Sequence, residues 1–330
     1  MPTLFLDRQL QNEDFVISDS LHRHLADFCR GSDFRIECRR RSHLFVPVIR
    51  EQYLDKIGRG EIAADTIIWD LEDGIPAASK QLARDCIAKL PAKPANVEYG
   101  VRINAGDPDE VERDVAVVSK YPFDSVTLPK GESGAEIARL MRLIGDDKTY
   151  AVTIESIRGL QAVDEIARTL RPGRDALGFG VGDMSTDLGV DRMSTCENPY
   201  FQQILGIIAL AGKRYDLELL DSVSARFNDP ENARKEAQLS HRCYGYTGKK
   251  LINPKQLEAI NSTFSPTHGE IAVHLATLES FFSKESRTNA RVVATEYKGL
   301  PAFIGSERHV KRYLRQGYLK LDAGFGARLT

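Results

Sequence analysis

"TYAVTIES" at residues 149–156 and "ALGFGVGD" at residues 176–183 are the stretches that indicate how this chain folds. Each is a mostly apolar run, typical of a buried strand, yet the first delivers Glu155 near its end and the second ends in Asp183. A carboxylate is costly to bury unless it has a partner, a cation or water. The two acids are about one strand–helix unit apart, so we expect them on adjacent strands, facing the same end of the sheet.

Eight segments of this kind recur, with amphipathic stretches between them. Several are nearly continuous runs of Val, Ile, Leu or Phe, as in strands that are covered on both faces. Between them, residues 133–145 and 158–173 have apolar side chains at helical spacing, and Ser133 and Gly145 are the predicted N-cap and stop of the first helix. The predicted strands begin at His43, Thr66, Tyr99, Ser125, Thr149, Ala176, Leu217 and Gly248.

Eight strand–helix alternations in roughly 220 residues match a (β/α)₈ TIM barrel, although a doubly wound open sheet has the same alternation. The polar residues favour the barrel. An open sheet concentrates its ligand groups at one switch point, whereas a barrel gathers them from many strand ends around one axis. Here the ends of five consecutive strands carry Asp70, Glu72, Asp73, Arg102, Asn104, Lys130, Glu155 and Asp183.

The predicted organisation is therefore an α/β TIM barrel with an extension at each end. We expect an N-terminal extension over residues 1–41, which contains a helix within residues 18–31, and a barrel domain over residues 42–264. Residues 265–330 are expected to form a C-terminal helical segment, for which a neighbouring subunit is a candidate packing partner.

Composition excludes several classes of partner. The chain has 330 residues, of which 42% are hydrophobic and 28% charged, and its net charge of −2 gives no electrostatic case for binding nucleic acid or an anionic membrane. Its five scattered cysteines favour reduced thiols. No signal peptide is recognisable, and no apolar run approaches the roughly 20 residues of a membrane helix. We therefore expect a cytoplasmic protein.

Glu155 and Asp183 together predict a magnesium site. Mg²⁺ prefers oxygen ligands, keeps several waters and takes only one or two protein carboxylates, which leaves positions for a substrate. The alternative is that each acid pairs with an arginine or caps the next helix. Basic residues, Arg102 and Lys130, are expected at the same end of the barrel.

The segment "IIWDLEDG" at residues 67–74 supplies three more acids, Asp70, Glu72 and Asp73. They are candidates to hold metal-bound water, to orient cationic groups or to act as a base, and the sequence does not decide among these roles.

"VRIN" places Arg102 and Asn104 on one face of the third strand. Arginine at a barrel mouth suits a fork-like contact with a carboxylate or an oxyanion, and the alternative is a buried salt bridge to Asp70 or Glu72. Lys130 is a candidate Schiff-base lysine, but the nearby acids favour a non-covalent, cationic role. The glycine-rich residues 178–189 do not fit the dinucleotide-binding spacing, and the histidines show no zinc spacing.

Seven motifs together resemble the citrate lyase β-subunit-like lyases, a group in the HpcH/HpaI aldolase/citrate lyase superfamily that includes the malyl-CoA and citramalyl-CoA lyases. The resemblance runs from Arg41 to Pro266. The motifs, in order, are "RSHLFVPV", "IIWDLEDGIP", "VRIN", "VTLPKGES", "TIESIRGL", "GFGVGDMSTDLG" and "GYTGKKLINPKQ".

The resemblance implies a TIM barrel that assembles as a trimer or hexamer, with Glu155 and Asp183 at the Mg²⁺-binding positions and Arg102 at the position of the substrate arginine. It also implies that a carbon–carbon bond beside a carbonyl is cleaved or formed, with one fragment commonly carried as a CoA thioester. Two departures concern CoA and the catalytic acid. Val48-Ile49 replaces the family's Gly-Asn turn, although Arg50 remains, and Gly305 stands where some members carry an aspartate.

We therefore expect a Mg²⁺-dependent carbon–carbon lyase that acts on a small keto or hydroxy acid, for example one related to oxaloacetate, or on an acyl-CoA. A thioesterase and a non-catalytic ligand-binding barrel are the alternatives. The predicted metal ligands are Glu155 and Asp183. The predicted substrate contacts are Arg102, Asn104, Glu155 and Arg50. The predicted catalytic residues are Arg102, Asp70, Glu72, Asp73 and Lys130.

Overall fold

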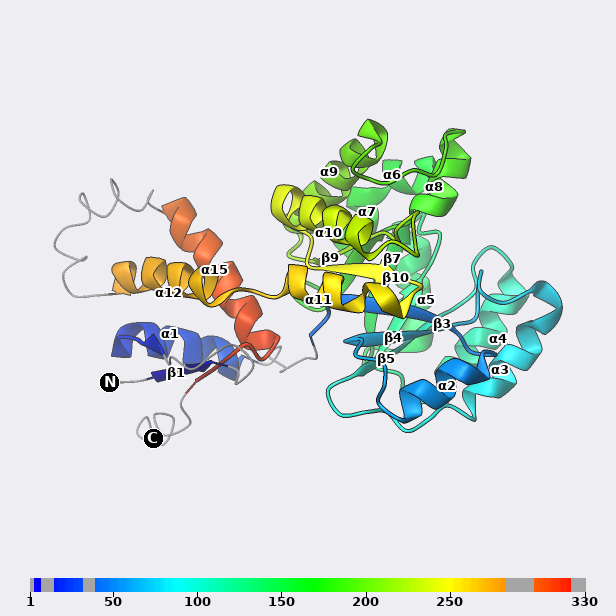
Figure 1. Cartoon of the computed structure of the whole chain (residues 1–330), viewed down its shortest axis with the longest axis horizontal. Helices are drawn as coiled ribbons and strands as arrows, with labels where there is room; N and C mark the ends of the chain where they lie inside the picture. The colour runs from blue at the N-terminus through cyan, green and yellow to red at the C-terminus, as the bar shows by residue number, and fades with distance from the viewer. Residues whose placement is uncertain (1–2, 7–14, 32–38, 283–299, 322–330) are drawn as a thin grey trace. The chain divides into compact units, whose positions relative to one another are not determined.

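A computed structural model describes residues 3–6, 15–31, 39–282 and 300–321 of the chain (Figure 1). It contains two compact units. One is formed by Arg40–Ser265, and the other by Met1–Arg39 together with Pro266–Thr330.

The larger unit is built on a closed barrel of eight parallel strands, in the order β10-β3-β4-β5-β6-β7-β8-β9. This confirms the predicted TIM barrel, and all eight predicted strands are present. Their bounds are β3 (Ser42–Pro47), β4 (Thr66–Asp70), β5 (Glu98–Arg102), β6 (Ser125–Leu128), β7 (Thr149–Ile154), β8 (Ala176–Phe179), β9 (Glu218–Asp221) and β10 (Gly248–Leu251).

Helices lie outside the strands and cover the barrel (Figure 1). Two short 3₁₀ segments, Ala77–Ser79 and Pro254–Gln256, precede α3 and α11. The helices of this unit are α2 (Glu51–Gly58), α3 (Lys80–Ile87), α4 (Pro108–Val118), α5 (Gly134–Ile144), α6 (Ile157–Gln161), α7 (Val163–Thr169), α8 (Val181–Leu188), α9 (Pro199–Arg214), α10 (Pro230–Tyr244) and α11 (Leu257–Phe264).

Helix α5 shows how local sequence sets these elements. Ser133 is the N-cap, and its side chain accepts a hydrogen bond from the backbone N–H of Glu136. This satisfies one of the donors left free at a helix start. Gly145 ends the helix with a φ of 116°, a conformation that favours glycine. Both predicted end residues are confirmed, and the buried face is formed by Gly134, Ile137, Leu140, Met141 and Ile144.

Two predicted elements differ from the structure. Residues 158–173 were expected to contain one helix, but α6 and α7 are separated at Ala162, whose φ and ψ are −91° and 5°. Both pieces contact α9, but α6 also contacts α8, whereas α7 also contacts α5. The strand that we expected to reach Asp183 ends at Phe179, so Asp183 lies in the first turn of α8. A carboxylate at that position is favoured by the helix dipole.

Strand register brings the future site residues together. Asp70 lies opposite Arg102 where β4 pairs with β5, and Ile154 lies opposite Phe179 where β7 pairs with β8. Glu155 therefore follows the end of β7 directly beside the start of the β8–α8 turn. Because all eight strands are parallel, their carboxyl ends meet at one mouth of the barrel.

The opposite end of the barrel is closed by buried polar side chains. Arg40 Nε donates to Glu98 Oε2 at 2.7 Å, and His43 Nε2 lies 3.2 Å from the carbonyl oxygen of Arg40. Burial lowers the pKa of His43 to about 4, although the charge of Glu98 acts in the opposite direction. His43 is therefore neutral at physiological pH.

The smaller unit joins the two ends of the chain. It has a three-stranded antiparallel sheet in the order β11-β1-β2, made of Leu319–Leu321, Thr3–Leu6 and Phe15–Val16. Its helices are α1 (Asp19–Arg30), α12 (His268–Phe282) and α15 (Leu300–Arg315), and α1 confirms the helix predicted near the N-terminus.

One shared core holds the ends of the chain in the smaller unit together. Leu21 and Leu25 of α1 are grouped there with Ile271 of α12 and Val310 of α15. We expected the two ends as separate extensions, and the proposed packing of the C-terminal segment on a neighbouring subunit stays a prediction.

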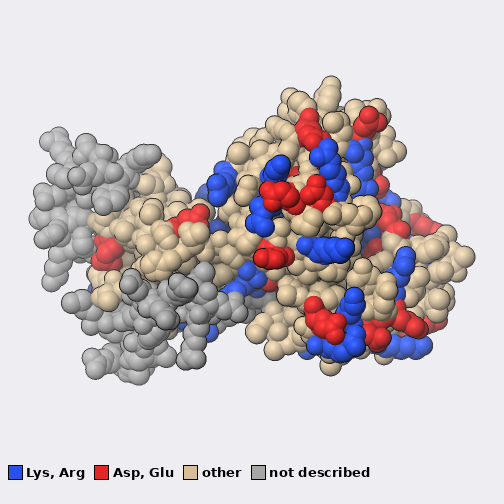
Figure 2. Space-filling model, viewed as in Figure 1, with Lys and Arg blue, Asp and Glu red and all other residues tan. Residues whose placement is uncertain are grey.

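Acidic and basic side chains alternate over the barrel face that is visible in Figure 2. The expectation that the chain has no nucleic-acid partner stays a prediction. No helix among the described residues is long and apolar enough to cross a membrane. Cys38 lies outside the described residues, and the other cysteines, Cys29, Cys86, Cys196 and Cys243, are free thiols.

Candidate active site

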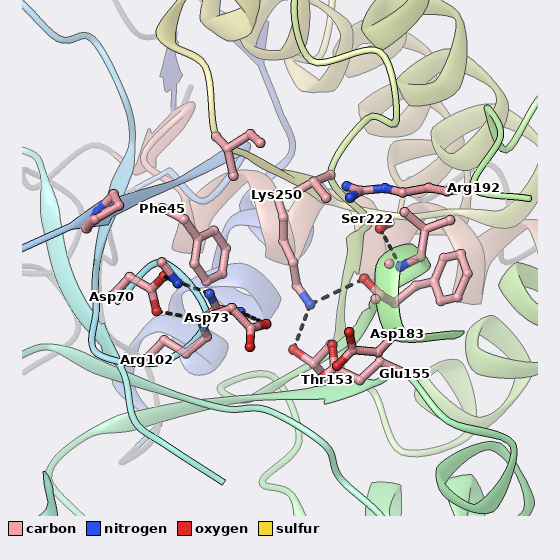
Figure 3. A pocket seen from close by; sticks show the side chains of 18 of the residues that line it. Phe45, Asp70, Asp73, Arg102, Thr153, Glu155, Asp183, Arg192, Ser222 and Lys250 are labelled. Atoms are coloured by element: carbon pink, nitrogen blue, oxygen red, sulfur yellow. Dashed lines mark hydrogen bonds and ion pairs between the residues drawn. The ribbon is translucent and has the colours of Figure 1, made fainter. Parts of the chain in front are cut away.

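A cavity of about 510 Å³ lies at the carboxyl ends of the barrel strands (Figure 3). Its volume is in the range of small-molecule sites, and this end of a TIM barrel is where active sites form. Phe45, Phe179 and Ile252 supply apolar surface. The charged residues that line it are Arg50, Asp70, Asp73, Arg102, Glu155, Asp183, Arg192 and Lys250.

Arg102 is fixed by the acids that follow β4. Its Nε and Nη2 atoms donate to the two carboxylate oxygens of Asp70, both at 2.7 Å, and Nη1 lies 3.0 Å from Glu72 Oε2. Burial alone would raise the pKa of Asp70, but the charge and hydrogen bonds of Arg102 lower it. Since a guanidinium has five N–H donors, the pairing holds Arg102 in place and leaves at least one donor for a ligand.

Glu72, which contacts Arg102, also forms an ion pair with Lys130. Lys130 Nζ lies 3.1 Å from Glu72 Oε1. Burial raises the pKa of Glu72 to about 7, against the lowering effect of Arg102 and Lys130. Burial alone would lower the pKa of Lys130, but Glu72 and its neighbouring acids raise it. A charged, paired amine does not favour Schiff-base chemistry at Lys130.

Glu155 is buried, with 8% of its surface exposed, and only one of its oxygens is engaged. Oε1 accepts a hydrogen bond of 2.7 Å from the backbone N–H of Lys130, whose φ of 51° turns that group toward it. Among the described residues, no donor lies within hydrogen-bonding distance of Oε2. Burial raises the pKa of Glu155, and the charge of Lys250 offsets this only in part.

Asp183 reaches the same cavity from the first turn of α8. The start of this helix is held by Ser222, whose Oγ accepts a hydrogen bond of 2.8 Å from the backbone N–H of Val181. Asp183 is 47% exposed, and Lys130 Nζ lies 3.8 Å from its Oδ2. At this distance and exposure the ion pair is weak, so Asp183 remains available to a cation.

The donor set fits Mg²⁺. Glu155 and Asp183 offer carboxylate oxygens, and Oε2 of the buried Glu155 accepts no hydrogen bond from the described residues. Within the described ranges, no group of three or more His, Cys, Asp or Glu side chains is placed to hold a metal. A site of two carboxylates matches the habit of Mg²⁺, which completes its coordination with water and substrate oxygens.

The structure brings most of the predicted site residues to the cavity, including Arg50, Asp73 and Arg102. Three are set back from its lining. Glu72 and Lys130 contact residues that line it, as described above. The Asn104 amide donates to Asp114 Oδ2 at 2.7 Å and to the carbonyl oxygen of Leu71 at 2.9 Å, so this side chain ties the loop after β4 to α4.

Two charged cavity residues were missed by the sequence analysis, the exposed Arg192 and the buried Lys250. Lys250 lies in β10, is 5% exposed, and its Nζ donates to Thr153 Oγ1 at 2.7 Å (Figure 3). The signal was the pair "KK" at residues 249–250, because successive side chains of a barrel strand point alternately inward and outward. One of these two lysines had to face the interior.

The sequence profile of the HpcH/HpaI aldolase/citrate lyase family matches residues 41–254, a span that contains all eight barrel strands. The chain belongs to this family. The resemblance stated from the motifs is thereby confirmed, and membership supports a lyase-type enzyme. The family match spans the cavity residues from Phe45 to Ile252.

Proteins similar in sequence to this chain are named for different activities. A (3S)-malyl-CoA thioesterase of Cereibacter sphaeroides (strain ATCC 17029) is 32% identical over 74% of this chain and 84% of its own length. The citrate lyase subunit beta of Leuconostoc mesenteroides subsp. cremoris is also 32% identical, over 70% of this chain and 79% of its own.

A solved structure is similar as well. The citrate lyase beta subunit of M. tuberculosis, complexed with oxaloacetate and magnesium, is 26% identical with a TM-score of 0.58 and covers 68% of this chain and 96% of its own.

Proposed function

We propose that this chain is a Mg²⁺-dependent carbon–carbon lyase that cleaves or forms a bond in a small hydroxy or keto acid, either free or as a CoA thioester. The observation that carries the proposal is that Glu155, Asp183 and Arg102 face one cavity at the mouth of the barrel. The citrate lyase beta subunit of M. tuberculosis, which was solved with oxaloacetate and magnesium, supports this choice of ligand.

The roles proposed for the residues follow from their contacts. Glu155 and Asp183 hold the metal, which supplies a Lewis acid and a template for the oxygens of an oxo acid. Arg102 donates from a fixed position to the oxygen on the reacting carbon, where negative charge develops. Asp70 and Glu72 are positioning residues that keep the guanidinium in place. A preorganised donor of this kind needs no rearrangement during the reaction.

The test is a substrate panel. The purified chain is incubated with Mg²⁺ and malyl-CoA, citramalyl-CoA, citryl-CoA or free hydroxy acids, and the release of an oxo acid is measured. We expect at least one substrate to be cleaved and EDTA to abolish the reaction. Failure to cleave any of them, together with ligand binding that EDTA does not change, contradicts the proposal.

Thioester hydrolysis is the second candidate, because a relative with 32% identity is named (3S)-malyl-CoA thioesterase. The products separate the two reactions. A lyase converts malyl-CoA to an oxo acid and a shorter acyl-CoA, whereas a thioesterase releases free CoA and the intact hydroxy acid. A free-thiol assay run beside an oxo-acid assay distinguishes them in one experiment.

A barrel that only binds ligands would hold an acid tightly in the presence of Mg²⁺ without turnover in either assay.

Assembly as a homo-oligomer and a cytoplasmic location also stay proposals. Light scattering of the full chain tests the first, with a mass three or six times that of the 36.8 kDa chain as the expected result.

A further inference from the structure

The two neighbouring lysines of β10, Lys249 and Lys250, point in opposite directions and have different partners. Lys249 points away from the cavity and is paired with two acids, since its Nζ lies 2.8 Å from Asp221 Oδ2 and 3.2 Å from Glu236 Oε2. Lys250 points into the barrel and lines the cavity. Its Nζ donates to two neutral oxygens, Thr153 Oγ1 at 2.7 Å and the carbonyl oxygen of Phe179 at 3.3 Å.

Lys250 is therefore a buried cation without an acid of its own. Among the described residues, no carboxylate forms an ion pair with it. An ammonium group has three N–H donors, and two of them are used. Burying such a group without a direct ion pair is unfavourable, and the charge of Glu155, which acts on it from across the cavity, would be shared with a bound metal ion. A bound anion would satisfy both its charge and its third donor.

The barrel wall makes room for this ammonium group. A Cβ atom added at Gly178 would lie 2.6 Å from Lys250 Nζ and 2.7 Å from its Cε, closer than side chains pack. The lysine side chain crosses the space that any residue larger than glycine at position 178 would fill. Gly178 thus leaves the space that the Lys250 side chain occupies.

The charges around the cavity define the ligand that fits. Four acids (Asp70, Asp73, Glu155 and Asp183) and four bases (Arg50, Arg102, Arg192 and Lys250) line it, so their formal charges cancel. A divalent metal ion leaves two positive charges uncompensated. Two carboxylates on one ligand neutralise both, whereas a monocarboxylate leaves one.

We propose that Lys250 is a specificity-determining residue that donates its third N–H to the second carboxylate of a dicarboxylic acid bound at the Glu155–Asp183–Arg102 site. This assignment rests on the proposed function. Burial lowers the pKa of Lys250 to about 8, with Arg102 adding to the effect and Glu155 opposing it, so the amine is mostly charged at pH 7.

Lys250→Met tests the assignment because it keeps most of the stem and removes the charge. Lys235→Met is the matched control, since Lys235 is exposed on α10 and does not line the cavity. Calorimetric titrations with Mg²⁺ alone, and then with malate or lactate in the presence of Mg²⁺, separate the effects. Malate carries two carboxylates and lactate one.

We expect Lys250→Met to weaken malate binding by at least about tenfold and lactate binding by less than about threefold. Mg²⁺ itself should bind more tightly, because a cation near Glu155 has been removed. The control should match the wild type in all three titrations. A merely structural lysine would instead weaken metal and both acids together.

Equal losses for malate and lactate, or no loss for malate, overturn the assignment while leaving the proposed function intact. A wild-type protein that binds neither acid with Mg²⁺ contradicts both. If Lys250→Met does not fold, a crystal structure of the wild type with Mg²⁺ and malate decides. A carboxylate oxygen about 2.8 Å from Lys250 Nζ supports the assignment, and a malate placed away from this amine overturns it.

Discussion

Gly180→Ala should weaken Mg²⁺ binding without changing any proposed ligand. A Cβ atom at position 180 would lie 2.3 Å from Glu155 Oε2 and 2.6 Å from Glu155 Cβ, whereas ordinary contacts begin at 3.4 Å. Glu155, including its Cβ atom, must therefore shift, and its carboxylate by about 1 Å, whereas metal–ligand distances in genuine sites stay within about 0.2 Å of their standard values. The conformation of residue 180 is not the obstacle, because Gly180 has a φ of −118°, which alanine adopts freely.

We expect the affinity for Mg²⁺ to fall by at least about tenfold, the lower end of the range for residues that orient a metal ligand. Overpacking should also lower the free energy of unfolding by about 1–3 kcal/mol. Calorimetry measures the first quantity and urea denaturation the second. Gly182→Ala is the control, because its nearest atoms belong to Arg192 at 3.8 Å and leave room for a methyl group. A folded Gly180→Ala protein with the wild-type affinity for Mg²⁺ would refute this reasoning.

Three further outcomes follow from the site and the barrel base. Glu155→Ala should abolish Mg²⁺ binding while the circular dichroism spectrum stays unchanged, and activity that persists in metal-free buffer would exclude the metal mechanism. The pKa of His43 is lowered to about 4 in the folded protein, so the free energy of unfolding should rise by up to about 3 kcal/mol as pH rises from about 4 to 6.5. Urea titrations of His43→Gln should show a smaller rise over this pH range. The pKa of Glu72 is raised to about 7 in the folded protein, so its contribution to the free energy of unfolding should decrease as pH rises from about 4.5 to 7. Without this opposing contribution, the free energy of unfolding of Glu72→Gln should rise more steeply with pH than that of the wild type. A shallower rise would contradict the raised pKa of Glu72.

Periodicity and strand-end chemistry predicted the barrel correctly. Apolar strand segments that alternate with amphipathic helices are local features of the sequence. So are helix ends, which is why Ser133 and Gly145 could be assigned as the start and end of a helix from the sequence alone. The charges at successive strand ends also indicated which mouth of the barrel holds the site, because parallel strands bring their carboxyl ends together.

Features that depend on long-range contacts could not be predicted in this way. The joining of the two chain ends depends on pairs such as Ser18 and Glu279, 261 residues apart, whose backbone N–H and carboxylate form a hydrogen bond of 2.9 Å. The inward position of Lys250 depends on the absence of a side chain at Gly178 on a different strand. The exact end of β8, and with it the place of Asp183 on a helix, depends on Ser222 of the next strand segment.

A crystal structure with Mn²⁺, located by its anomalous scattering, is the most direct test that Glu155 and Asp183 share one divalent ion. Mn²⁺ accepts the same oxygen ligands as Mg²⁺. We predict one strong peak in the barrel mouth, with an oxygen of each carboxylate about 2.2 Å away and open positions facing the cavity. A crystal saturated with Mn²⁺ that shows no ion there, with Asp183 still beside Lys130, would contradict the metal-dependent chemistry proposed for this chain.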